Sequence, residues 1–114
     1  MQRRTLLLTS LAALLAGTST ARADVLRDVF NAQEMVLRRS IQVDLQLAEL
    51  YTSEVDGLYG PGTRAALLQA AERVAAHPLG GEVFDLSRRE DAERFISLMA
   101  AGVFSFLFDD GYEG

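Results

Sequence analysis

The residues best suited to chemistry lie in one short stretch, VDGLYGPGTRAAL, at positions 55–67. It contains the carboxylate of Asp56, the ring of Tyr59 and the guanidinium group of Arg64. A guanidinium group pairs with carboxylates, and the free amides at a helix start attract anions. The ring of Tyr59, or of the nearby Tyr51, could stack on a flat face of a ligand. These groups suit noncovalent binding of a ligand that carries carboxylates.

The same stretch could instead be a turn that only joins two helices. Gly57 and Gly60 relieve steric limits, and Asp56 can accept hydrogen bonds from the following backbone amides as an Asx-turn. Pro61 suits the first position of a helix, and Thr63 can support its first turn. On this interpretation Tyr59 packs in the core and Arg64 lies on a solvated helix face. Both interpretations stay open.

Catalysis and metal binding find little support. Glu49, Glu54 and Asp56 are close in sequence and are of the residue type that glycosidases use as paired carboxylates, but nothing in the sequence brings them together. The chain has no cysteine and one histidine, His77, which argues against a zinc site. Residues 53–56 lack the ligand spacing of a calcium-binding loop. The sequence predicts no catalytic residue, no metal site and no cofactor.

Residues 1–23 have the pattern of an export signal. Arg3 and Arg4 precede an apolar stretch from Leu6 to Ala16, and Ala21-Arg22-Ala23 has the small residues of a cleavage site. Such a short apolar stretch cannot cross a bilayer, which takes about 20 residues. The paired arginines also resemble a twin-arginine signal, so that route and the general secretory route both stay open. We therefore predict a periplasmic or secreted protein that starts at Asp24.

The charge of the exported chain limits the classes of partner that it is expected to bind. The full chain carries 11 basic and 16 acidic residues, a net charge of −5. Loss of Arg3, Arg4 and Arg22 with the signal peptide would leave 8 basic residues against the same 16 acids, a net charge of −8. This balance argues against binding nucleic acid, which favours a basic surface, and against docking on anionic lipid. No membrane span is expected in the mature chain.

Apolar residues at helical spacing predict helices in the first half of the mature chain. The first runs from Asp24 to about Arg38. The next segment, from Ile41 to Leu50, alternates polar and apolar residues like a strand, but its apolar positions also fit one helix face. Gln, Leu, Ala and Glu are strong helix formers, and no partner strand is evident, so a helix is predicted.

Two more helices are predicted after the glycine-rich stretch. One runs from Pro61 to about His77, where the HPLGG sequence should end it because a residue before proline avoids the helical conformation. The last begins at a capping box formed by Ser87 and Glu90 and continues to about Phe108. Its apolar run is too short to span a membrane and suits a buried helix.

From residue 42 onward, the glycine-rich region contains an ordered set of residues: Gln42, Leu45, Val55-Asp56-Gly57, Tyr59-Gly60-Pro61, Thr63 and Ala66. This order resembles the peptidoglycan-binding-domain-like family over residues 39–68. Its D-G-x-Y-G-P-x-T core fixes the residue at six of eight positions.

The resemblance implies an all-α fold and noncatalytic binding of cell-wall peptidoglycan, through its glycan or its stem peptide. The fold would be a small orthogonal three-helix bundle over residues 39–108, with residues 24–38 as an N-terminal helical extension and 109–114 as an acidic tail. The candidate binding residues are Tyr51, Asp56, Gly57, Tyr59, Gly60, Thr63 and Arg64. The alternative is a domain that keeps this fold without wall binding and docks a periplasmic protein through its acidic surface or its 95–108 helix.

Overall fold

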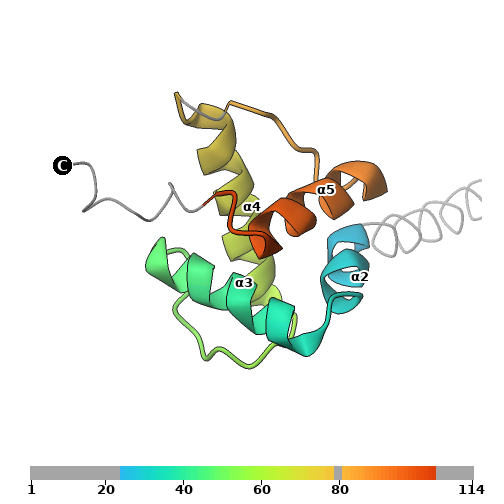
Figure 1. Cartoon of the computed structure of the whole chain (residues 1–114), viewed down its shortest axis with the longest axis vertical. Coiled ribbons are helices and arrows are strands. Elements are labelled where there is room, and N and C mark those ends of the chain that lie inside the picture. Colours follow the sequence, from blue (N-terminus) through green and yellow to red (C-terminus); the bar gives the residue numbers. More distant parts are fainter. Residues whose placement is uncertain (1–23, 79–80, 105–114) are drawn as a thin grey trace, which may run out of the picture.

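The computed structural model describes residues 24–78 and 81–104. These residues form four helices and no strand: α2 (Val25–Asn31), α3 (Met35–Leu47), α4 (Pro61–Ala76) and α5 (Arg89–Ala100). The all-α prediction is therefore confirmed for this part of the chain (Figure 1). The predicted signal peptide, the acidic tail and the end of the last predicted helix, residues 105–108, lie outside the described residues.

The prediction of one helix over 24–38 is wrong, because the chain turns a corner after α2. Asn31 ends α2, Glu34 is extended with φ −67° and ψ 154°, and Met35 begins α3. The boundary expected at residue 39 thus falls inside α3. A single straight helix through Leu47 would be about 35 Å long. The corner instead turns α2 so that it packs against α5 (Figure 1).

A left-handed residue ends α3 and begins the connection to α4. Glu49 has φ 62°, and two hydrogen bonds surround it, from Glu49 N to Gln46 O (2.8 Å) and from Leu50 N to Leu45 O (2.9 Å). This is the Schellman arrangement, in which glycine is the usual left-handed residue. A residue with a Cβ atom pays a steric penalty of about 1 kcal/mol there.

The ends of α4 agree with the predictions. Pro61 lies at the first helical position, and the helix ends at Ala76. His77 has φ −76° and ψ 134°, which is the extended conformation that proline imposes on the residue before it. Gly81, with φ +82°, donates its N–H to the carbonyl of Val74 at 2.9 Å.

Both ends of the last helix differ from the prediction. No side chain caps α5, whose N-cap residue is Arg88, and the Ser87 hydroxyl binds Asp85 Oδ1 instead, at 2.6 Å. The expected Ser87–Glu90 capping box is therefore wrong. The helix stops at Ala100 because Gly102 takes a left-handed conformation with φ +78° and closes a second Schellman arrangement. Within residues 24–78 and 81–104, no helix has the length and hydropathy needed to cross a membrane.

One apolar core joins all four helices. Phe30 of α2, Ile41 of α3, Leu67 of α4 and Phe95 of α5 are fully buried in it. Burial of each such side chain contributes about 2 kcal/mol or more. The described part of the 95–108 run, which the alternative function used as a docking helix, supplies core residues at its buried positions: Phe95, Ile96, Met99 and Phe104.

Aromatic rings anchor the segment that leads into α5. The ring of Phe84 lies 5.1 Å from that of Phe95 and 6.1 Å from that of Phe104, centroid to centroid, and both pairs are edge-to-face. Phe95 and Phe104 stack at 5.4 Å. Edge-to-face and offset pairs of this kind stabilise a core beyond their buried area. Residues 81–86 are thereby held alongside α4 and α5 without regular secondary structure.

Candidate functional site

A buried glutamine organises the glycine-rich turn from inside. Gln42 of α3 has no exposed surface. Its Oε1 accepts the N–H groups of Gly57 (2.8 Å) and Asp56 (3.0 Å), and its Nε2 donates to the Leu58 carbonyl (3.0 Å) and to Thr63 Oγ1 (3.1 Å). These four bonds use both lone pairs of Oε1 and both hydrogens of Nε2. The turn is therefore fixed to α3 by one fully satisfied side chain.

The predicted structural roles of two polar residues in the turn are confirmed. Asp56 Oδ1 accepts the N–H of Leu58 at 2.9 Å, which is an Asx-turn. Thr63, in the first turn of α4, is buried, and its hydroxyl lies 3.4 Å from the Leu58 carbonyl. It joins the turn to the start of the helix.

The two glycines predicted to relieve steric limits differ. Gly57 has φ +75° and is buried, and a Cβ atom there would collide with the sulfur of Met35. Gly60 has φ −157°, an extended conformation open to any residue, and nothing lies within 4 Å of where its Cβ would be. The prediction is right for Gly57 and wrong for Gly60.

Tyr51 cannot serve as the stacking ring that was expected. Only 6% of it is exposed, and it belongs to the core. Its hydroxyl donates to the Glu54 carbonyl at 2.8 Å and lies 3.3 Å from Gln42 Nε2. Because its ring is buried, the predicted ligand-stacking role of Tyr51 is wrong, and the residue supports the turn instead.

The remaining candidate residues gather around an open cavity at the start of α4. Its volume is about 340 Å³. The lining residues come from α2 and its N-cap residue, the turn and α4: Asp24, Arg27, Tyr59, Gly60, Pro61 and Arg64. The structure thus brings three of the predicted binding residues together, and it places the other four beneath them as support.

The cavity combines basic side chains with a partly buried tyrosine. Arg27 pairs with Asp24 at 3.3 Å and with Asp28 at 3.7 Å. The ring of Tyr59 packs on Phe30 at 5.7 Å, and its burial raises the pKa of the Tyr59 hydroxyl. That hydroxyl is buried without a hydrogen-bond partner. No side chain caps the start of α4, where anions are favoured.

Sequence reasoning missed three residues of the site. Gln42 belongs to the sequence motif but was not predicted as a site residue. The clue in the sequence is that this polar residue lies on the helix face that also carries Ile41 and Leu45. Asp24 and Arg27 had no signal in the sequence, because the corner after α2 brings them to the glycine-rich turn. Only the fold places them there.

Within residues 24–78 and 81–104 there is no group of three or more His, Cys, Asp or Glu side chains that could hold a metal ion.

Comparison with protein-family models, with curated proteins and with solved structures finds no match to this chain. The interpretation of the site therefore depends on its own geometry.

Proposed function

We propose that this protein binds cell-wall peptidoglycan without catalysis, as an exported periplasmic or secreted protein. The observation that carries the proposal is the cavity at the start of α4, which joins the glycine-rich turn to Arg27 and Arg64. A stem-peptide carboxylate would pair with the Arg64 guanidinium group beside an uncapped helix start. The predicted export signal and the resemblance of residues 39–68 to the peptidoglycan-binding-domain-like family support the same assignment.

The proposed roles divide the site into a binding layer and a supporting layer. Arg64, Tyr59 and Gly60 line the cavity and would contact the ligand, together with Arg27. The supporting layer holds the turn in place and consists of Gln42, Tyr51, Asp56, Gly57 and Thr63. The three-helix bundle proposed from the resemblance would then be α3, α4 and α5, with α2 completing both the core and the cavity.

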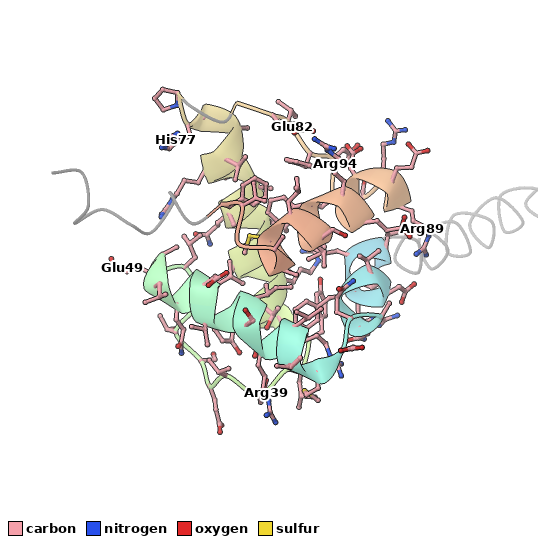
Figure 2. The ribbon with its side chains drawn as sticks, in the orientation of Figure 1. Arg39, Glu49, His77, Glu82, Arg89 and Arg94 are labelled. Carbon is pink, nitrogen blue, oxygen red and sulfur yellow. The ribbon has the colours of Figure 1, made fainter. Side chains whose placement is uncertain are left out.

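Co-sedimentation with purified insoluble peptidoglycan tests this function. Arg64→Ala should reduce the bound fraction at limiting wall concentration, with an affinity loss of about tenfold or more. Arg39→Ala is the matched control, because it removes the same charge from an exposed residue that projects away from the helices (Figure 2). Equal binding by both variants, or no sedimentation of the unsubstituted protein at low salt, would contradict the proposal.

A second variant tests the tyrosine without disturbing the core. Tyr59→Phe keeps the ring against Phe30 and removes the unpartnered hydroxyl. If that hydroxyl binds the ligand, the variant should lose wall affinity while its melting temperature stays the same or rises. Circular dichroism checks the folding of each variant.

An exposed apolar stripe on α3 favours a second candidate, docking of a periplasmic protein. Val36 is 67% exposed, Val43 41% and Leu47 59%, and their spacing of seven and four places them on one helix face. Substitution of Val43 and Leu47 by Asp should leave folding and wall sedimentation unchanged. If this candidate is right, a photo-crosslinking residue placed at position 47 should capture a partner protein in cells. The two Asp substitutions should then abolish complex formation with that partner.

A further inference from the structure

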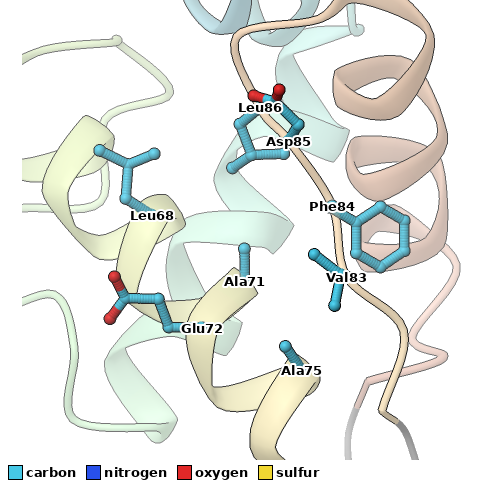
Figure 3. Close-up of a pocket in the computed structure, with 8 residues that line it drawn as sticks. All are labelled: Leu68, Ala71, Glu72, Ala75, Val83, Phe84, Asp85 and Leu86. Carbon is cyan, nitrogen blue, oxygen red and sulfur yellow. The ribbon is translucent and has the colours of Figure 1, made fainter.

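Three cavities follow one another along a single stripe of α4. The first, at the start of the helix, reaches Arg64. The second, of about 210 Å³, is lined by Leu26, Arg64, Leu68, Asp85, Leu86 and Ser87. The third, of about 290 Å³, is lined on the helix by Leu68, Ala71, Glu72 and Ala75 (Figure 3). Because neighbouring cavities share Arg64 and then Leu68, they are adjacent, and the three together are called the groove below.

The groove has the length of a short extended chain. Its helix side runs from Pro61 to Ala75, about 21 Å at 1.5 Å per residue. Its opposite wall in the second and third cavities is the segment 83–87, which faces α4 in Figure 3. A peptide in extended conformation advances about 3.3 Å per residue, so about six residues would fill it.

The charge of the groove changes from one end to the other over an apolar floor. Arg27 and Arg64 line the end nearest the glycine-rich turn together with Asp24, which pairs with Arg27 at 3.3 Å. Asp85 lines the second cavity with Arg64 and the third cavity with Glu72. Hydrogen bonds from Ser87 lower the pKa of the Asp85 carboxyl group, so it is charged at neutral pH. Between them the floor is apolar, with half-buried Leu68 and buried Leu86.

We propose that this groove binds a short extended peptide with a carboxylate at one end and an amino group about three residues away. The carboxylate would lie at Arg64 and the amino group near Glu72 and Asp85, since Arg64 and Glu72 are about 12 Å apart along the helix. Peptidoglycan stem peptides that contain a diamino acid belong to this class, whereas the neutral sugar hydroxyls of the glycan match neither charged half. The proposal deepens the proposed function and rests on it.

Titration of the purified exported protein with three soluble probes tests the ligand class. The probes are a muramidase-released disaccharide peptide, the free stem peptide and the peptide-free glycan, followed by isothermal calorimetry. The free peptide should bind about as well as the disaccharide peptide, and the glycan should not bind. Glycan binding equal to that of the disaccharide peptide would overturn the groove proposal while leaving wall sedimentation, and so the proposed function, intact. Peptide binding without wall sedimentation would contradict the proposed function and leave the groove proposal intact.

Paired substitutions place the peptide in the groove. Ala75→Trp fills the third cavity and should weaken peptide binding about tenfold or more. Ala65→Trp makes the same change at an exposed position of α4 that lines none of the three cavities, and it should have no effect. Equal effects of the two variants would overturn the proposal.

A charge test is independent of any packing change in Ala75→Trp. Glu72 is exposed, so Glu72→Gln should leave the fold unchanged. Acetylation of the peptide amino group should weaken binding to the unsubstituted protein several-fold but have little further effect on the Glu72→Gln variant. Additive losses would show that the amino group does not contact this residue and would overturn the assigned orientation.

Discussion

The segment between α3 and α4 and the segment that leads into α5 both lack regular structure, but different forces hold them. Residues 55–60 are fixed from inside by the buried amide of Gln42, which binds two backbone N–H groups and a carbonyl of the turn. Residues 81–88 are anchored by the buried side chains of Phe84 and Leu86. Their polar contacts, such as that between Glu82 and Arg94, are exposed (Figure 2).

This difference determines how each segment should tolerate change. Buried hydrogen bonds are costly to lose because the groups left behind have no access to water. Exposed ion pairs contribute little because water and salt replace them. The glycine-rich turn should therefore be rigid and sensitive to substitution, and the polar groups of the 81–88 segment should be replaceable.

The largest effect is expected at Gln42. Gln42→Ala removes the partners of the Asp56 and Gly57 N–H groups and should lower the free energy of unfolding by about 3 kcal/mol. Gln46→Ala is the control, since Gln46 reaches the same connection through one exposed bond to the Ser53 carbonyl at 3.1 Å; its loss should be below about 1 kcal/mol. Urea denaturation measures both. Comparable losses would mean that the turn is not held by buried hydrogen bonds.

A smaller but still clear difference is expected between two glycines of the turn. Gly57→Ala adds a Cβ atom at a positive φ and against Met35, which should cost about 2 kcal/mol. Gly60→Ala has an extended backbone and open space, so its stability should change by less than about 0.5 kcal/mol. Thermal unfolding of the two variants makes the comparison. A large loss at Gly60 would refute the assignment of strain to Gly57 alone.

At the end of α3 a substitution should stabilise the protein. Glu49→Gly relieves the left-handed strain of a residue with φ 62° and should raise the free energy of unfolding by about 1 kcal/mol. Glu49→Ala removes the same charge but keeps the Cβ atom, so it should bring no comparable gain. If the alanine variant gains as much, charge rather than backbone strain is responsible.

The smallest effect is expected in the 81–88 segment. The hydrogen bond from Arg94 lowers the pKa of the Glu82 carboxyl group below its ordinary value of 4.5. A carboxyl group whose pKa is lowered in the folded state stabilises that state at pH values above the ordinary pKa. This stabilisation is lost as the pH falls through the lowered pKa. Because both side chains are exposed, Arg94→Ala should leave the melting temperature unchanged within error at neutral pH and high salt. A drop that persists in high salt would show a role beyond this ion pair.

Local chemistry in the sequence was enough to predict several features. Proline at a helix start, the Asp56 side chain two residues before an amide and the His-Pro pair after Ala76 each act through the nearest backbone atoms. The corner after Asn31 and the absent Ser87–Glu90 capping box could not be predicted in the same way. Each depends on where a segment packs, and the local sequence permits both outcomes.

The sequence by itself determined that the part of the chain the structure describes is helical, that α4 starts at Pro61 and ends before Pro78, and that a tight turn precedes it. Those features follow from backbone sterics and from hydrogen bonds between near neighbours. Only the tertiary structure decided which candidate residues are exposed: Tyr51 is in the core, and Arg64 lines the cavity at the start of α4 together with Arg27. The burial of a particular candidate side chain and the meeting of distant residues depend on how helices pack, which the spacing of residues along the chain does not specify.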